Sequence, residues 1–398
     1  YFVLRISNFL RFSDFDLACL VTTLEPMIEP ASTPDEPVPS AETDSDSHDA
    51  SVVTDVIAVP EPLPQPNFGF AILWSFLLLG AQLIIGLVGG AFLAVLAVAQ
   101  GVSPQEFLDP ASEATAAINT LLIPVATLST TVTAIVVVVF LFRGKARRVI
   151  AWRGCSPTQW LLTILAVIPM SIVASELANW AAEVLPSFGS EMIDQLRGQS
   201  WLLVFFAACV LPGLGEEIFF RGFLSRGLCA RHGVVAGTLM ASLLFGLVHV
   251  EPVQSCGAAV MGIALQWVFL STRSLWAPIV LHTVNNTLAF AALKYGERYF
   301  PIPGYSYMPN DQLTHSPVVL FLAGLASAAA ICWAFYTSRT HWVLPSGKRW
   351  SAGYVTAQMP AKHLDARPVS GFPSVLSLIA VIATSGFLAW AIWFSIEK

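Results

Sequence analysis

The stretch GEEIFFRGFL, residues 215–224, places two adjacent carboxylates and a guanidinium inside a long apolar part of the chain. The 398 residues are 55% hydrophobic and only 12% charged, and the mean hydropathy is +0.68. An ordinary soluble domain carries about 25% charged residues. The composition therefore indicates a membrane protein, in which ionisable side chains face the interior of a helix bundle and have partners there.

Apolar segments long enough to cross a bilayer flank this stretch on both sides. About 20 mostly apolar residues span a hydrocarbon core of about 30 Å. We therefore predict an all-α, polytopic integral membrane helix bundle with about 8–9 transmembrane helices. The predicted helices cover residues 68–98, 117–142, 160–181, 201–229, 234–250, 256–272, 275–293, 316–337 and 372–396.

The chain begins with a region of different composition. Ten acidic residues and no Lys or Arg lie between Glu25 and Glu61, among many Pro and Ser residues. Such a segment buries too little apolar surface to offset the entropy of ordering. We predict a disordered acidic tail over 1–66, N-terminal membrane helices over 67–155, a membrane core over 156–295, and C-terminal membrane helices with a connecting loop over 296–398.

The charged loops predict how the chain is oriented. Cationic residues follow the second predicted helix (Arg143, Lys145, Arg147, Arg148 and Arg153), and acidic residues follow the third (Glu183, Glu191 and Asp194). Cationic loops are retained on the cytoplasmic side. We therefore expect a multi-pass protein, most simply of the plasma membrane, with the cationic loop and the acidic tail in the cytoplasm.

Cysteine usage and charge argue against two other classes of protein. The six cysteines are widely scattered and none forms a CxxC or CxxxC pair. This spacing indicates neither a disulfide framework nor a thiolate zinc site. Outside the acidic tail the charges are nearly balanced, so the sequence gives no support for a nucleic-acid partner.

The spacing within helix 201–229 separates the three charged residues. Glu217 and Arg221 are four apart, so they share a helical face and can form an ion pair. Glu216 is turned by about 100° from Glu217 and is left as a spare acid. The structural alternative is that all three form one buried network that fixes helix packing.

Two other predicted helices, 234–250 and 275–293, carry further polar residues at membrane depth. His249 lies four residues after Phe245, and His282 lies four residues before Asn286. A carboxylate and an imidazole can hold a water and remove its proton, or equally bind a divalent metal. Imidazole and amide N–H groups suit a developing oxyanion. A satisfied packing histidine and an interhelical hydrogen bond are the alternatives. For Glu176 and Asn179 we expect only an interhelical hydrogen bond or a boundary position.

The three patterns EExxxR (Glu216–Arg221), FxxxH (Phe245–His249) and HxxxN (His282–Asn286) occur in this order. Together they resemble the CPBP family of intramembrane proteases, which includes the CAAX proteases and bacteriocin-processing enzymes and is also called the ABI family. The resemblance covers about residues 160–295 and makes the predicted core, 156–295, the catalytic part.

The resemblance implies a membrane-embedded endopeptidase that acts on a membrane-associated protein or peptide. By this resemblance Glu216 and His249 activate the attacking water, Glu217 with Arg221 supports the site, and His282 with Asn286 stabilises the oxyanion. Glu216, His249 and His282 could equally bind a divalent metal such as zinc, and both mechanisms stay open.

The substrate also stays open. Eukaryotic members of the family process prenylated CAAX proteins, but no residue here identifies a prenyl-binding surface, so lipidation of the substrate is one alternative. A non-catalytic scaffold or bacteriocin-immunity protein with the same fold is a second hypothesis. A proton-coupled transporter is a third, disfavoured because no internal repeat is evident.

Overall fold

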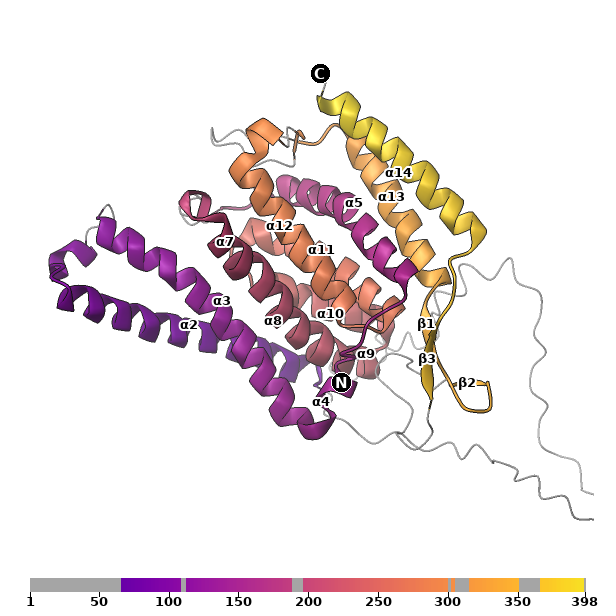
Figure 1. Ribbon diagram of the computed structural model, residues 1–398, viewed down its shortest axis with the longest axis horizontal. Coiled ribbons are helices and arrows are strands. Elements are labelled where there is room, and N and C mark those ends of the chain that lie inside the picture. The colour runs from indigo at the N-terminus through magenta and orange to yellow at the C-terminus, as the bar shows by residue number, and fades with distance from the viewer. Residues whose placement is uncertain are drawn as a thin grey trace, which may run out of the picture. The chain divides into compact units, whose positions relative to one another are not determined.

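The computed structural model describes residues 66–108, 112–187, 196–299, 302–304, 315–350 and 366–396. The predicted acidic tail lies outside these ranges, apart from its last residue. All nine predicted helices are present in the described part of the chain (Figure 1). The all-α, polytopic class predicted from the sequence is therefore confirmed.

The helix bounds agree with the predicted ones to within a few residues. The long helices are α2 (Phe68–Ala99), α3 (Glu113–Phe142), α5 (Pro157–Ala182), α11 (Pro252–Thr272), α12 (Trp276–Tyr299), α13 (Val318–Thr337) and α14 (Val375–Ile396). Short turns at Pro104–Leu108 and Arg143–Lys145 and the one-turn helix α4 (Ala146–Val149) lie in the connections. The start of α5 follows from local sequence: Ser156 forms a capping box with Gln159, and Pro157 occupies the first helical position.

Seven helices in the described residues are long and apolar enough to cross a membrane by length and composition. The protein is thus an integral, multi-pass membrane protein. The prediction of about 8–9 crossings counted two further helices. α10 (Val234–Leu247) has 14 residues, or about 21 Å, and is shorter than a bilayer core. α12 is long enough, but its polar residues make it less apolar than the seven.

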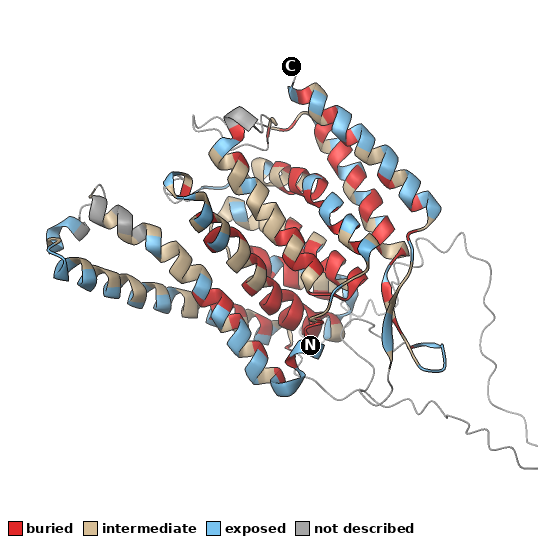
Figure 2. Ribbon diagram, viewed as in Figure 1, coloured by how far each residue is buried: buried red, intermediate tan, exposed pale blue. Residues whose placement is uncertain are grey.

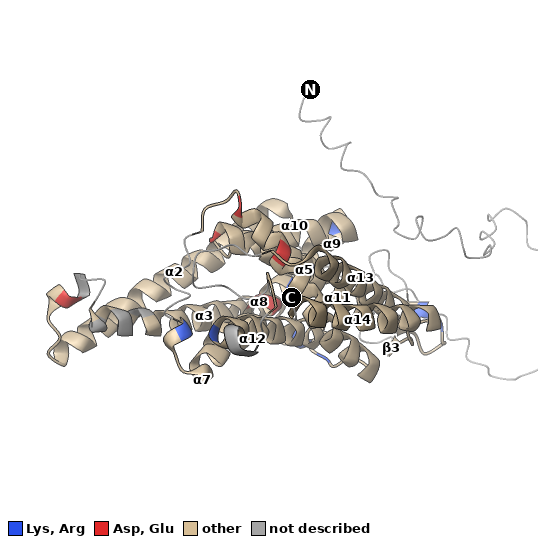
Figure 3. Ribbon diagram, turned by 90° about the horizontal axis from the view of Figure 1, so that it is seen from above, with Lys and Arg blue, Asp and Glu red and all other residues tan. Residues whose placement is uncertain are grey.

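The helices pack as pairs around a central helix 201–232. The hairpin of α2 and α3 extends to one side in Figure 1, and the pair of α13 and α14 lies on the other, with α5 between them. Buried residues concentrate in the central helix and its neighbours, whereas the outer helices α2 and α14 show many exposed apolar side chains (Figure 2). Described Lys, Arg, Asp and Glu residues are few in the view of Figure 3.

The central helix is not a regular α-helix. Two π-helical segments, Phe205–Val210 and Phe220–Leu224, flank α8 (Leu211–Phe219), and α7 (Trp201–Val204) and α9 (Ser225–His232) form its ends. π-helical turns inside α-helices often occur at functional sites. Here the regular part, α8, carries Glu216 and Glu217, and the second π segment carries Arg221.

Glycines let neighbouring helices approach α8 closely. A Cβ added at Gly215 would lie 2.7 Å from the Cα of Thr131 on α3, and one added at Gly213 would meet Thr283 on α12. Thr131 also donates a hydrogen bond to the carbonyl oxygen of Leu211, at 2.8 Å. The glycines that precede the two carboxylates therefore fix how deeply α8 is buried between α3 and α12.

The connection between α13 and α14, predicted as a loop, contains a small sheet. Strands β1 (Thr340–Val343), β2 (Arg349–Trp350) and β3 (Arg367–Ser370) are antiparallel in the order β2-β1-β3. Trp342 pairs with Trp350 on one side and with Pro368 on the other. The strands are two to four residues long, too short for an alternating pattern to stand out from the surrounding loop.

Candidate active site

The ion pair predicted by the spacing of Glu217 and Arg221 is present. Arg221 Nη1 donates to Glu217 Oε1 at 2.7 Å, and the two side chains are 2% and 0% exposed. Arg221 Nη2 also donates to the carbonyl oxygen of Gly262 on α11, at 3.1 Å. Hydrogen bonds and opposite charge offset part of the large cost of burying these groups.

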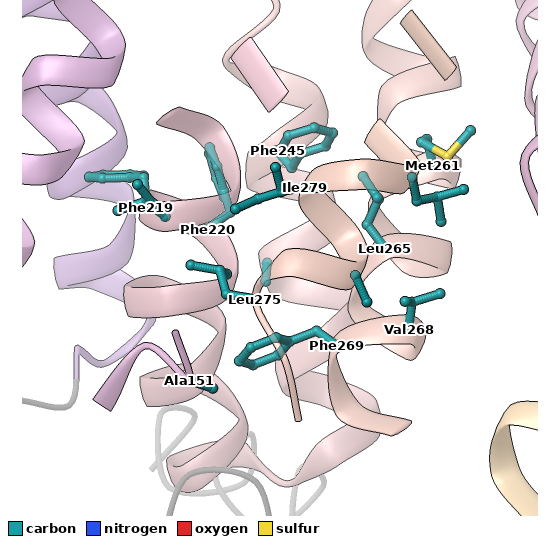
Figure 4. Close-up of a cluster of buried hydrophobic side chains, with 14 of the residues drawn as sticks. Ala151, Phe219, Phe220, Phe245, Met261, Leu265, Val268, Phe269, Leu275 and Ile279 are labelled. Carbon is teal, nitrogen blue, oxygen red and sulfur yellow. The ribbon is translucent and has the colours of Figure 1, made fainter. Parts of the chain in front are cut away.

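Aromatic rings close the site on its apolar side. Phe245 of α10 contacts the guanidinium of Arg221, whose central carbon lies 4.3 Å from the ring centroid. The same ring meets His249 and His282 edge to face, with centroids 5.1 and 5.8 Å apart. Figure 4 shows Phe220 and Phe245 in the buried cluster of apolar side chains. This packing explains why Phe belongs to the FxxxH pattern: the ring supports three polar partners at once.

The other carboxylate, Glu216, lies where two imidazoles converge. Glu216 Oε2 is 3.9 Å from Nε2 of His249 and 3.9 Å from Nε2 of His282. Both distances exceed a hydrogen bond. This oxygen is buried and has no hydrogen-bond partner among the described residues. The structure therefore brings together three of the predicted site residues but leaves space between them.

The second nitrogen of each imidazole fixes its protonation. His249 Nδ1 lies 2.8 Å from the carbonyl oxygen of Phe245, which can only accept, so this nitrogen carries the proton. His282 Nδ1 lies 2.9 Å from Glu217 Oε1, which is already paired with a cation, so it also donates. In the neutral rings both Nε2 atoms then present a lone pair toward Glu216.

The distance between Glu216 Oε2 and His249 Nε2 is one that a single water can bridge. An oxygen about 2.8 Å from both Glu216 Oε2 and His249 Nε2 would see them at about 90°, near the angle between the hydrogens of a water. Such a water would donate one proton to each acceptor. The geometry suits a water whose lone pairs remain available for attack.

His249 lies in a turn rather than in a helix. The predicted helix 234–250 ends early, at Leu247, so His249 is in the connection to α11. The next residue, Val250, has φ of +63°, a conformation that is rare for a β-branched residue. Glu251 then caps α11 by accepting from the backbone N–H of Gln254. This strained turn directs His249 into the site.

Asn286 has a structural partner as well as a place on the His282 face of α12. Its Nδ2 donates to the carbonyl oxygen of Ala208 at 3.2 Å. Ala208 lies four residues before Pro212, which has no N–H to donate to the preceding turn. Asn286 therefore supplies a donor that the proline lacks. Its neighbour Asn285 accepts from Ser171 on α5 at 2.6 Å, which is a contact between two helices.

The metal alternative depends on Glu216, His249 and His282. In the part of the chain that the structure describes, no group of three His, Cys, Asp or Glu side chains is placed to hold a metal ion. Glu216 Oε2 lies 3.9 Å from each of the two imidazole nitrogens, so the metal alternative stays a prediction beside the water mechanism.

Glu176 and Asn179 lie outside this site. Glu176 Oε1 accepts from His315 Nδ1 at 2.8 Å, and its Oε2 accepts from the backbone N–H of Ser316 at 2.7 Å and from Asn179 Nδ2 at 3.3 Å. His315 Nε2 also lies 3.0 Å from Glu183 Oε1. The contact of His315 was not predicted, because His315 lies in a loop 139 residues from Glu176 and no short-range pattern connects the two.

Comparisons with known proteins place the site within a matched segment. Residues 198–288 match the family described as Type II CAAX prenyl endopeptidase Rce1-like, and this segment contains every predicted site residue. A protein of Bacillus subtilis (strain 168) described as "Putative membrane peptidase YdiL" is 29% identical over 86 residues. The alignment covers 22% of this chain and 35% of that relative, so it spans about a third of the relative's length. No solved structure matches the chain.

Proposed function

We propose that this chain, whose residues 198–288 match the family described as Type II CAAX prenyl endopeptidase Rce1-like, is an intramembrane endopeptidase of the CPBP type. Its substrate would be a membrane-associated protein or peptide. The observation that carries the proposal is Glu216 Oε2, which is buried, lacks a hydrogen-bond partner among the described residues, and lies 3.9 Å from two imidazole nitrogens.

In the proposed mechanism Glu216 is the general base. A water donates one hydrogen to Glu216 Oε2 and the other to His249 Nε2, and its oxygen attacks the scissile carbonyl carbon. The attack forms a carbon–oxygen bond and moves one proton onto Glu216. When the tetrahedral intermediate collapses, the carbon–nitrogen bond breaks and Glu216 returns that proton to the departing amine. One water is consumed, and the carboxylate is regenerated.

The oxyanion is stabilised by groups on α12. In the form in which both ring nitrogens carry a proton, His282 donates from Nδ1 to Glu217 and from Nε2 to the oxyanion. Asn286 supplies the amide hydrogen that is not used on Ala208. Arg221 pairs with the Glu217 carboxylate on its other side. Glu217 and Arg221 thus position catalytic groups without touching the substrate.

The proposal is tested with the purified full chain in lipid nanodiscs. Peptides with and without a C-terminal prenylated cysteine are incubated with the protein, and products are identified by mass spectrometry. Glu216→Gln keeps the shape of the side chain but removes the base, so it should abolish cleavage. Glu176→Gln is the matched control, because it changes a buried carboxylate outside the site. Full cleavage by Glu216→Gln would contradict the assignment.

The cleavage assay, a gene-deletion rescue and a flux measurement together distinguish the alternatives. Cleavage of prenylated peptides alone would assign CAAX-type C-terminal processing, and cleavage of both peptide classes would assign a broader substrate. A non-catalytic scaffold or immunity protein would cleave nothing, and the phenotype of a gene deletion would be rescued equally by wild type and Glu216→Gln. A proton-coupled transporter would show substrate flux in proteoliposomes without cleavage.

A further inference from the structure

A polar pocket lies apart from the proposed active site, at the junction of α5, α11 and the small sheet. It is lined by the segment before α5 (Arg153, Gly154, Cys155 and Ser156), by Thr272 of α11, by Thr340 of β1, and by β3 (Arg367, Pro368, Val369 and Ser370). Its volume is about 600 Å³, which is in the usual range for small-molecule sites. Of the lining residues only Thr272 falls in the matched segment 198–288.

The pocket lies at the level where membrane helices end. Ser156 caps the start of α5, and Thr272 is the last residue of α11; both helices are long and apolar enough to span a membrane. Tryptophans surround this level, with the rings of Trp152 and Trp276 4.6 Å apart. Tryptophan is enriched at the boundary between hydrocarbon and water. The pocket is therefore at the depth of lipid headgroups.

The charged groups of the lining are all cationic. Arg153 and Arg367 contribute guanidinium groups, and the lining residues include no carboxylate. The guanidinium carbon of Arg153 lies 4.7 Å from the ring centroid of Trp342, a contact that holds the side chain without using its N–H donors. Burial lowers the pKa of Arg153 to about 10, so the group still carries its charge at neutral pH.

The surroundings add to the positive potential. Burial lowers the pKa of His341 on β1, and the nearby positive charges of Arg349, Arg273 and Arg339 lower it further. Burial also raises the pKa of the Cys155 thiol to about 12, so this group brings no negative charge into the pocket. An anion that enters the pocket is attracted by several cations.

Gln159 makes the walls of the pocket rigid. This residue is fully buried in the first turn of α5. Its Nε2 donates to the carbonyl oxygen of Ser338 and to Thr340 Oγ1, both at 3.0 Å, and its Oε1 accepts from Ser370 Oγ at 3.3 Å. One amide thereby joins a membrane helix to strands β1 and β3. The pocket is built into the fold and does not depend on an exposed loop alone.

We propose that this pocket binds the phosphate of an anionic lipid headgroup. Guanidinium groups match phosphate oxygens with paired hydrogen bonds, and the hydroxyl of Ser156 lines the same space. Basic pockets beside membrane helices bind such headgroups on the cytoplasmic side. The segment before α5 belongs to the loop whose cationic residues predict a cytoplasmic position. The site goes beyond the proposed peptidase function and does not depend on it.

The test measures lipid binding to the purified full chain in neutral detergent. Short-chain phosphatidylglycerol, short-chain phosphatidylcholine, glycerol phosphate and inorganic phosphate are titrated by calorimetry, and retained lipid is identified by native mass spectrometry. We expect phosphatidylglycerol to bind at least tenfold more tightly than phosphatidylcholine. Arg153→Gln should weaken phosphatidylglycerol binding at least tenfold. The exposed Arg147→Gln on α4, outside the lining, should leave it within twofold.

A second variant and a measurement of unfolding separate loss of lipid binding from loss of folding. Arg153→Gln also loses its contact with Trp342, so its thermal unfolding is measured, and Arg367→Gln, on an exposed residue, provides a second loss of charge. Equal binding of the two lipids, or binding unchanged in both variants, would overturn the proposal. If glycerol phosphate or inorganic phosphate binds as tightly as the lipid, the pocket takes a soluble phosphate and the lipid assignment is wrong. None of these outcomes depends on peptide cleavage.

Discussion

Two clusters of histidine and glutamate in this protein differ in the distances between their polar atoms. In the open cluster, Glu216, His249 and His282, the carboxylate is 3.9 Å from each imidazole. In the closed cluster, Glu176, Glu183 and His315, the two ring nitrogens lie 2.8 and 3.0 Å from carboxylate oxygens. The same residue types therefore occur once beyond hydrogen-bond distance and once in direct contact.

The difference follows from what holds each imidazole. In the open cluster Nδ1 of His249 contacts the carbonyl oxygen of Phe245, and Nδ1 of His282 contacts Glu217, so both partners lie outside the cluster. The Nε2 atom of each ring faces Glu216. In the closed cluster both ring nitrogens of His315 contact carboxylates of the cluster itself. Direct ion pairs stabilise structure, whereas a gap between unsatisfied acceptors leaves reactive groups available. The residue types alone do not distinguish a structural cluster from a candidate catalytic cluster.

The largest expected effect comes from neutralising the carboxylate of the open cluster. Glu216→Gln should reduce peptide cleavage at least about 100-fold, because a general base contributes about 10²- to 10⁴-fold. The unfolding temperature should stay within about 2 °C of wild type, since Glu216 Oε2 has no hydrogen bond to lose among the described residues. A large fall in unfolding temperature would mean that Glu216 belongs to a structural network like the closed cluster.

Breaking the support of the open cluster should cost both stability and activity. Glu217→Gln leaves Arg221 buried without its opposite charge, which we expect to lower the free energy of unfolding by about 3–5 kcal/mol. It also removes the anion that holds His282. In a double-mutant cycle with Arg221→Gln, the two losses should not add, because each variant removes the same ion pair. Additive losses would show that the pair is not coupled.

Changing the helix spacing should alter the gap itself. Gly215→Ala puts a methyl group 2.7 Å from the Cα of Thr131, so α8 must move from α3, at a cost of about 1–3 kcal/mol. Cleavage should fall as Glu216 moves with the helix. Gly86→Ala in α2 is the control, because nothing lies within 4 Å of its added Cβ. Unchanged unfolding and cleavage in Gly215→Ala would contradict this account of the gap.

The smallest effect is expected at the closed cluster. His315→Gln removes the contact between His315, which is 34% exposed, and Glu183, which is 56% exposed, and such an exposed contact contributes little. Loss of the bond to buried Glu176 should lower the free energy of unfolding by about 1–2 kcal/mol. Cleavage should stay within twofold of wild type. A strong loss of cleavage without unfolding would assign the closed cluster to function.

The sequence predicted those features that depend on neighbours along one helix. The pairing of Glu217 with Arg221 followed from i,i+4 spacing, and the helices followed from apolar segments of sufficient length. The π segments, the turn at His249 and the small sheet were not predicted, because their causes lie in tertiary packing and in short segments. His315 reaches Glu176 across 139 residues, a distance that no local pattern bridges. The roles of the site residues stay predictions for experiment.

The short helix α10 has a consequence for the surrounding lipid. Its 14 residues reach only about 21 Å, against a hydrocarbon core of about 30 Å. The N–H groups of the turn that follows donate to backbone carbonyl oxygens. Backbone outside a helix is tolerated in the hydrocarbon only beside protein or water, so the turn must be covered by protein, be reached by water, or lie where the bilayer thins. Because hydrophobic mismatch of this kind depends on bilayer thickness, we expect the activity of the protein to depend on the acyl-chain length of the surrounding lipid.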